Sequence, residues 1–315
     1  MKKILKEKFK TVFGGRKKQK TVNGLVEYHN ELINKYPNIA IFAFDRIGAE
    51  ITVFGIYEKK VLEGLKDCIF NKIVIQNSVC LDVGANIGNH TLYFAQFFNQ
   101  VYSFEPHPEI FELLKFNVRK SKNVKVFQFG LSNKNDEMII TTNEPTEYGA
   151  SSVQKKTSLK PANDKNIFDV QVKKFDDFFN NINEENNISF IKLDIESHEL
   201  YALQGMEKAL KKYSPIICLE QNKIEFNYYG NELSSKSINF LKDNGYSFFY
   251  EILYERQWRY FNNYNLFLKN IVKLFEAILF GVPEKINRLK MINEFSRKRI
   301  NQNYQALIAS KLQLV

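Results

Sequence analysis

A short segment that joins an apolar strand to a helix carries the residues with the clearest chemical meaning. Asp82 ends the strand, and Gly84 and Gly88 follow at a D-x-G-x-x-x-G spacing. Glycines in such a turn let the backbone approach a ligand, because a side chain there would keep the ligand away. Glu105 ends a second strand, where a carboxylate can accept hydrogen bonds from both ribose hydroxyls of a nucleoside. The pattern predicts half of a nucleotide-binding site.

The glycine spacing also indicates which cofactor this site takes. A dinucleotide pyrophosphate is usually held by a G-x-G-x-x-G turn, and residues 82–88 do not have that spacing. S-adenosylmethionine has no phosphate, and its methionine part needs a loop with room for an ammonium and a carboxylate group. We therefore expect S-adenosylmethionine as the cofactor.

A second polar cluster follows a later apolar strand and contains Asp194, Glu196, His198 and Glu199. Methyl transfer to an alcohol is an in-line displacement that also needs a base for the hydroxyl proton. His198 or Asp194 suits that role, and we predict Asp194, Glu196 and His198 as catalytic residues. The alternative is that Glu196 or Ser197 caps the next helix, with Glu199 near its positive end.

Metal and redox chemistry are not expected. Carboxylates beside a histidine suit Mg²⁺ or Mn²⁺, but the sequence gives no ligand set, so no metal site is predicted. Cys68, Cys80 and Cys218 have no C-x-x-C spacing, and two of them lie in apolar strand-like runs. We interpret them as buried, reduced thiols of a cytoplasmic protein.

Alternating strand and helix patterns position these residues. The predicted strands are 79–83, 100–104, 124–128, 188–194, 215–219, 246–251 and 264–268, and the predicted helices lie near 89–97, 108–119, 198–212 and 232–243. This succession predicts an α/β fold with a mostly parallel, seven-stranded, Rossmann-like sheet, one antiparallel strand and helices on both faces. Ligands of such sheets bind at the carboxyl ends of the strands, where the polar clusters fall, including Gly130–Ser132 and Glu220–Gln221.

Additions flank this predicted domain, which we assign to residues 76–269. Residues 21–75 are expected to hold a helix at 22–35, a hairpin of strands 40–44 and 50–54, and a helix at 58–69. The polar stretch 143–166 is too long for an ordinary connection, and such loops are usually functional or disordered.

The net charge of +10 belongs to the two ends of the chain. Residues 1–20 carry +8 and residues 269–315 carry +6, which leaves −4 for the remainder. Residues 1–20 form a basic segment, and residues 270–315 are predicted to form a basic amphipathic helical extension. No RNA- or DNA-binding motif accompanies these charges, so we predict no nucleic-acid partner.

The basic ends leave three alternatives open. Basic amphipathic helices lie on anionic lipid, pack on their own domain or contact a second subunit. No run of 18 apolar residues and no signal-peptide pattern occurs. We expect a cytoplasmic protein, with peripheral contact to the inner membrane and oligomer formation both left open.

Five ordered motifs resemble the FkbM family of S-adenosylmethionine-dependent methyltransferases. They are GIYE from Gly55, DVGANIGNHTLYFA from Asp82 with FEPHP from Phe104, IKLDIESHELYALQGM from Ile191, and ICLEQ from Ile217. The resemblance spans roughly residues 50–270. It implies a class I methyltransferase fold and O-methylation of a hydroxyl, often on a sugar or a polyketide-like product.

The resemblance also implies site residues. The predicted cofactor-binding residues are Asp82, Gly84, Asn86, Gly88, Asn89, Glu105, Leu131, Ser132, Asp194 and Tyr57. Ser151 and Ser152 are expected near the cofactor or the acceptor. The family often has Gly where this chain has Ser197. If that position needs a positive φ, serine costs about 1 kcal/mol.

The predicted function is O-methylation of a sugar hydroxyl in a bacterial surface polysaccharide or its precursor. The acceptor is then a glycan or another hydroxylated small molecule. Two alternatives remain, namely a non-catalytic scaffold of the same fold in envelope glycan assembly and a nicotinamide-dependent oxidoreductase.

Overall fold

A computed structural model gives the fold of the chain. It describes residues 29–30, 32, 34–43, 45–73, 77–142, 151–155, 167–179, 187–222, 225–229, 232–256, 285–293, 295 and 304–315. Every structural statement below refers to these residues.

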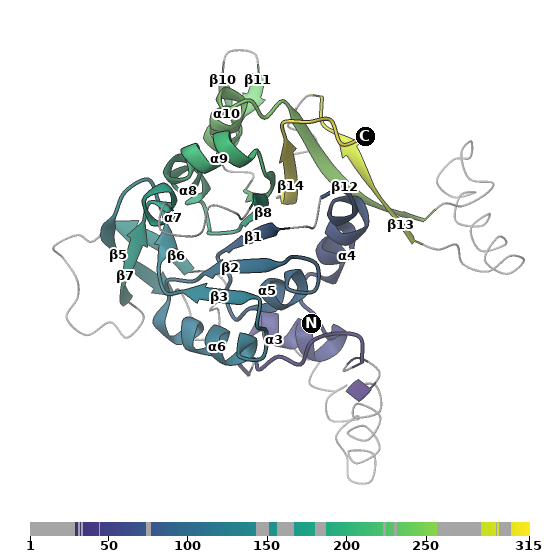
Figure 1. Cartoon of the computed structure of the whole chain (residues 1–315), viewed down its shortest axis with the longest axis vertical. Coiled ribbons are helices and arrows are strands. Elements are labelled where there is room, and N and C mark those ends of the chain that lie inside the picture. Colours follow the sequence, from purple (N-terminus) through teal and green to yellow (C-terminus); the bar gives the residue numbers. More distant parts are fainter. Residues whose placement is uncertain are drawn as a thin grey trace, which may run out of the picture.

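One eight-stranded sheet forms the centre of the described structure (Figure 1). Its strand order is β13-β12-β14-β9-β8-β1-β2-β3. The strands are β1 (Ser78–Val83), β2 (Gln100–Phe104), β3 (Val124–Phe127), β8 (Asn187–Leu193), β9 (Ile216–Gln221), β12 (Phe248–Arg256), β13 (Lys285–Met291) and β14 (Tyr304–Ser310). Strands β1, β2, β3, β8 and β9 are mutually parallel. The prediction of a mostly parallel sheet in an α/β fold is confirmed, but the described sheet has eight strands instead of the predicted seven, and two of them, β13 and β14, run opposite to the others instead of the predicted one.

Helices cover both faces of this sheet because alternate residues of each buried strand point to opposite sides. Val79, Leu81 and Val83 pack in one core cluster with α8 (Glu199–Gly205), α9 (Glu207–Tyr213) and α10 (Lys236–Asp243). Cys80 packs on the other face with α4 (Lys59–Cys68) and α5 (Asn89–Phe94). Figure 1 shows the two groups of helices on opposite sides of the sheet. Because the five parallel strands run in the same direction, their carboxyl ends lie at one edge of the sheet.

Several predicted elements occur close to their expected bounds. They include β1, β2, β3, α4, α5, α6 (Pro108–Val118) and α10. The helix expected at 198–212 is divided into α8 and α9 at Met206, whose φ of −120° and ψ of 20° are not helical.

The predicted hairpin at 40–54 is wrong. Residues Arg46–Phe54 form helix α3. Asp45 is its N-cap and accepts hydrogen bonds from the amides of Ile47 and Gly48, and Gly55 ends the helix with a φ of 79°. Ile47 and Ile51 are buried one turn apart, so their spacing is that of a helix face rather than of a strand.

The predicted helical extension at 270–315 is also wrong in its described part. Strand β13 pairs with β12, and β14 lies between β9 and β12. Both strands run antiparallel to their neighbours, so the C-terminal residues complete the sheet instead of forming a separate extension. Alternation explains this, because Leu289 is buried while Arg288 is exposed. The strand expected at 264–268 and the amphipathic stretch 271–282 lie outside the described residues.

Two smaller sheets complete the described structure. Strands β4 (Gly130–Leu131), β7 (Ile167–Lys173), β5 (Asp136–Thr142) and β6 (Ser151–Lys155) form one, with α7 (Phe175–Phe179) following β7. Strands β10 (Asn227–Tyr229) and β11 (Glu232–Ser234) form the other. Ser151 and Ser152 thus lie in a strand within the predicted long loop. None of the described helices is long and apolar enough to cross a bilayer.

Candidate active site

The glycine turn after β1 is shaped by close contact with the turn after β8. Gly84 has a φ of 80°, and a Cβ there would lie 1.9 Å from the carbonyl oxygen of Asp194. Gly88 has a φ of 91° and would meet Leu114 at 2.8 Å. Both glycines have a backbone conformation that side chains disfavour, and at Gly84 the backbone of Asp194 also leaves no space for a side chain. The glycine turn after β1 and the predicted polar cluster that begins at Asp194 are therefore in direct contact.

The amide groups of this turn are already engaged within the protein. The amides of Gly84 and Ala85 both donate to the carbonyl oxygen of Phe104 at 3.0 Å. The amide of Asn86, which has a φ of 48°, donates to Glu105 Oε2 at 3.0 Å. Phosphate-binding turns instead point such amides at the ligand. This turn offers few donors to a phosphate.

Glu105 is buried at the end of β2, with only 6% of the residue exposed. Its second oxygen, Oε1, accepts from the amide of His107 at 2.9 Å. Burial raises the pKa of Glu105 to about 7, although these two hydrogen bonds act in the opposite direction. Each carboxylate oxygen has two lone pairs, so both oxygens retain capacity to accept a hydroxyl.

Lys192 connects the turn after β1 with the turn after β8, and it is not among the site residues predicted from the sequence. Its amine lies 3.0 Å from Asp194 Oδ2, 3.2 Å from the carbonyl oxygen of Gly84 and 3.7 Å from Asp82 Oδ1. Burial alone would lower the pKa of Lys192, but the carboxylates of Asp194 and Asp82 raise it. Lys192 is therefore a buried cation between two carboxylates.

Asp82 supports the turn rather than lining the pocket. It is fully buried, and its Oδ2 accepts from Thr91 Oγ1 at 2.6 Å. Its partner in the register of β1 and β8 is Lys192. The role indicated by these contacts is to hold Lys192 and the start of α5, while its predicted direct contact with cofactor stays a prediction.

Asp194 and Glu220 form a carboxyl pair at the ends of β8 and β9. Their side chains are hydrogen-bonded to each other. Burial alone would raise the pKa of Asp194, but Lys192 and this hydrogen bond lower it. Burial and the charge of Asp194 raise the pKa of Glu220 to about 9. At neutral pH Asp194 is therefore ionised, and Glu220 carries the proton of the pair.

Two residues from the start of α5 hold two residues from the segment before α4. The side chain of Asn89 accepts from the amide of Tyr57 at 3.0 Å and donates to its carbonyl oxygen at 3.1 Å. His90 Nε2 lies 3.3 Å from Glu58 Oε2. Glu58 has a φ of 51° and a ψ of 38°, a left-handed conformation that costs about 1 kcal/mol for a residue with a side chain. Asn89 and Tyr57 are among the cofactor-binding residues predicted from the sequence, whereas Glu58 and His90 are not.

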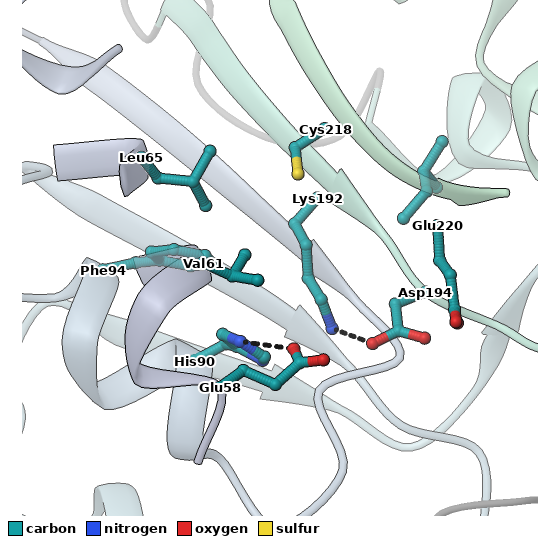
Figure 2. A pocket seen from close by; sticks show the side chains of 10 residues that line it. Glu58, Val61, Leu65, His90, Phe94, Lys192, Asp194, Cys218 and Glu220 are labelled. Carbon is teal, nitrogen blue, oxygen red and sulfur yellow. Dashed lines mark ion pairs between the residues drawn. The ribbon is translucent and has the colours of Figure 1, made fainter. Parts of the chain in front are cut away.

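These groups surround a pocket at the carboxyl ends of β8 and β9 (Figure 2). Its polar lining comes from Glu58, His90, Lys192, Asp194 and Glu220. The walls are Val61, Leu65, Phe94, Leu193 and Cys218. Low-polarity walls strengthen the electrostatic field of the charged groups.

The predicted catalytic histidine lies outside this pocket lining. His198 Nε2 lies 3.1 Å from Ser132 Oγ, and its ring packs on Tyr201 with centroids 4.8 Å apart. Burial lowers the pKa of His198, which keeps the imidazole neutral at neutral pH. Ser132 and Leu131 are themselves buried. Their predicted cofactor contacts, and the role of His198 as base, stay predictions.

The turn between β8 and α8 contains Ser197, the position at which the family often has Gly, and its backbone has the positive φ angles that glycine favours. Ser197 has a φ of 73° and Glu196 a φ of 50°. Ser197 Oγ donates to Glu225 Oε1 at 3.0 Å, and Glu199 Oε1 accepts from the amide of Ile195 at 3.1 Å. Burial raises the pKa of Glu196, and the charge of Asp194 adds to this effect. Glu199 thus stabilises the turn, and Glu196 stays a predicted catalytic residue.

One signal in the sequence indicates Lys192. Residues two apart in a strand share a face, so Lys192 lies on the same face as Asp194 in an otherwise apolar run. A buried lysine at such a position needs a carboxylate partner. Glu58 and His90 offered no comparable signal, because their pairing joins two segments that the local pattern does not relate.

Comparisons with known proteins indicate the family of this chain. The sequence profile of the methyltransferase FkbM domain matches residues 82–248. Hexuronic acid methyltransferase AglP of Haloferax volcanii is 28% identical over 143 residues, which cover 45% of this chain and 55% of that protein. Methyltransferase 1 of Beauveria bassiana is 27% identical over 148 residues, which cover 42% and 59%. The chain thus spans little more than half the length of these curated relatives.

A solved structure of the same family is also similar. The crystal structure of methyltransferase FkbM from Methylobacillus flagellatus KT has 19% identity and a TM-score of 0.33, with 48% of this chain and 37% of that chain covered. The family profile covers more than half of the present sequence. The chain therefore belongs to the FkbM methyltransferase family, and its α/β sheet is a class I methyltransferase fold.

Proposed function

We propose that this protein is an S-adenosylmethionine-dependent O-methyltransferase that acts on a sugar hydroxyl. The observation that carries the proposal is the combination of a glycine turn with few free amides and a buried acidic residue, Glu105, beside it. The pocket next to this turn contains carboxylates, which suit a cationic ligand. A phosphate-free, positively charged nucleoside fits this set of groups.

The residues present fit the parts of this cofactor. Glu105 would accept from the ribose hydroxyls with the lone pairs that Asn86 and His107 leave free. A nicotinamide dinucleotide fits less well, because the amides of Gly84 and Ala85 are bonded to Phe104 and not to a ligand. Two of the similar solved structures are described as complexes, one with SAH and one with S-adenosyl-L-methionine.

When bound, S-adenosylmethionine supplies an electrophilic methyl group. The protein then has to hold the acceptor oxygen against it and receive the hydroxyl proton. Asp194 is ionised beside Lys192, and His198 is neutral because it is buried. Either can receive a proton. The apolar walls, such as Val61 and Phe94, limit the access of water.

The sugar acceptor rests on the family and on one relative. AglP is described as a hexuronic acid methyltransferase. We extend this to a sugar of a bacterial surface polysaccharide or its precursor, methylated in the cytoplasm. The basic residues at the two ends of the chain suit an anionic or membrane-linked acceptor.

Calorimetric titration with S-adenosylhomocysteine, and with NADH for comparison, tests the cofactor. Binding of S-adenosylhomocysteine alone supports the proposal, and a gain of one methyl mass on glucuronic acid or on a larger sugar would then identify the acceptor. Binding of NADH alone would favour an oxidoreductase. Binding of neither would favour a scaffold of the same fold.

Replacing Glu105 with glutamine should weaken binding of S-adenosylhomocysteine by about 1.5–3 kcal/mol, because hydrogen bonds to a charged group are lost. The wild-type affinity should also rise with pH through about 7, because the ribose hydroxyls need the ionised carboxylate and burial raises its pKa to that value. Titrations between about pH 6 and about pH 8 measure both effects. A glutamine variant with the wild-type affinity and pH dependence would rule out this ribose position.

Replacing His198 with alanine should slow methyl transfer by about a hundredfold or more if its imidazole is the base. Affinity for S-adenosylhomocysteine should stay unchanged, because a base acts on the acceptor hydroxyl and not on the cofactor. Single-turnover rates with the sugar acceptor, together with calorimetry, measure the two quantities. An unchanged rate would leave Asp194 as the candidate base.

A further inference from the structure

Lys192 is the one ammonium group among the described lining residues of the pocket in Figure 2, and the carboxylates of Asp194 in the lining and of Asp82 beside it both face this group. Lys192 lies within 3.7 Å of Asp82 as well as 3.0 Å from Asp194, so two carboxylates share one ammonium group. Asp82 Oδ1 is buried and makes no hydrogen bond among the described residues. Glu58 adds a third carboxylate to the same region. The pocket is therefore suited to a second cation.

Glu58 is directed into this pocket rather than used to stabilise its own helix. It is the N-cap residue of α4, yet its side chain makes no capping hydrogen bond. Its Oε2 faces His90, and Figure 2 shows its other oxygen directed toward the space between Lys192 and Asp194. Only 17% of the Glu58 side chain is exposed. A carboxylate oriented in this way, and largely removed from water, needs a positively charged partner.

Hydrogen bonds from Asn89 hold the backbone next to Glu58 and so help to direct its carboxylate into the pocket. Asn89 binds both the amide and the carbonyl oxygen of Tyr57, and the next residue, Glu58, is held in the left-handed region. Strained residues persist where the surrounding contacts over-determine them, and they cluster at ligand-binding positions. Asn89, at the start of α5, thus holds the backbone of Tyr57, and the next residue, His90, holds the carboxylate of Glu58.

The geometry points to Glu58, held by His90 and acting with Asp194, as the binding site for the α-ammonium group at the amino-acid end of the cofactor. This inference rests on the proposed function. Glu58 and Asp194 present carboxylates to one space, and an ammonium group between them makes charge-assisted hydrogen bonds. The apolar walls Val61 and Leu65 suit the methylene groups that join an amino-acid end to its sulfur atom.

The inference predicts that the pocket distinguishes nucleosides by their amino-acid end. S-adenosylhomocysteine has this end, and 5′-methylthioadenosine is the corresponding nucleoside without it. The wild-type chain should bind S-adenosylhomocysteine at least about tenfold more tightly. In Glu58→Gln most of this preference should disappear, because affinity for S-adenosylhomocysteine falls while affinity for 5′-methylthioadenosine stays the same.

Calorimetry of the full chain with both nucleosides measures the preference. Glu63→Gln is the matched control, since Glu63 lies on α4, is 42% exposed and pairs with Lys59. Glu58→Asp is the second variant, because it keeps the charge and should retain part of the preference if Glu58→Gln folds poorly. Thermal unfolding of each variant verifies that it is folded.

Each outcome separates this inference from the proposed function. Equal wild-type affinities for the two nucleosides, or an unchanged preference in Glu58→Gln, would overturn the inference and leave the cofactor assignment intact. Equal weakening of both nucleosides in Glu58→Gln would assign Glu58 a purely structural role. Failure of the wild-type chain to bind either nucleoside would contradict the proposed function itself.

Discussion

Replacing Lys192 with methionine should lower the free energy of unfolding by about 3–5 kcal/mol, the usual cost of removing one partner from a buried ion pair. Asp82 is fully buried and has the Lys192 amine 3.7 Å away, so the variant leaves its charge without a counterion. Methionine has a similar length and is apolar, so little packing is lost. Urea denaturation followed by circular dichroism measures the change.

Two further variants identify the cause of this loss. Lys211→Met removes a lysine that pairs with Glu207 on the surface of α9 and has a side chain 61% exposed. That variant should lose less than about 1 kcal/mol, as exposed pairs do. The double variant with Lys192→Met and Asp82→Asn should be more stable than the two separate losses imply, because the fully buried Asp82 then carries no unpaired charge and only the partly exposed Asp194 lacks its partner. A loss for Lys192→Met as small as that of Lys211→Met would contradict the buried-cation interpretation.

Replacing Gly84 with alanine should destabilise the protein by about 2–5 kcal/mol, since a left-handed alanine is strained and the new methyl group overpacks the site. The methyl group would lie 1.9 Å from the carbonyl oxygen of Asp194. The turns after β1 and β8 would have to separate, which would disturb the Lys192 contacts to Gly84 and Asp194. Binding of S-adenosylhomocysteine should weaken by about tenfold or more.

Gly245 provides the matched control for this prediction. It has a φ of 88°, close to that of Gly84, but its nearest heavy atom to an added Cβ is Lys311 Cδ at 3.8 Å. Gly245→Ala therefore introduces the backbone strain without the collision and should cost about 1–2 kcal/mol. Thermal and urea unfolding of both variants give the comparison. Equal losses would mean that the contact between the two turns tolerates a methyl group.

These contacts explain why the D-x-G-x-x-x-G segment depends on a second motif far along the chain. Gly84 meets the carbonyl oxygen of Asp194, and Lys192 bonds to both residues. A ligand held by Glu105 and by the Glu58–Asp194 space would therefore contact a unit that one buried lysine holds together. Lys192→Met tests whether this lysine stabilises the two turns, and Gly84→Ala tests whether their close contact is needed for ligand binding.

Local sequence patterns were sufficient to predict the parallel part of the sheet and the glycine turn at its edge. Strands such as β1 are mostly apolar and buried along their whole length, and the glycines and Glu105 follow such strands at short spacings, so hydrophobic pattern and turn residues located them. The same local patterns failed at α3. There Asp45 and Gly55 act as helix caps, while alternating apolar residues resembled a strand.

Which charged residues meet depends on how distant segments pack, and local sequence patterns did not predict it. Lys192 and Asp82 are 110 residues apart in the chain and lie opposite each other because β8 is the neighbour of β1. Glu58 and His90 pair because α4 and α5 pack on the same face of the sheet. Strand β14 inserts between β9 and β12, although its sequence neighbours gave no indication of a partner. The physical reason is that burial and ion pairing depend on contacts between distant segments, which hydrophobic period and turn chemistry do not encode.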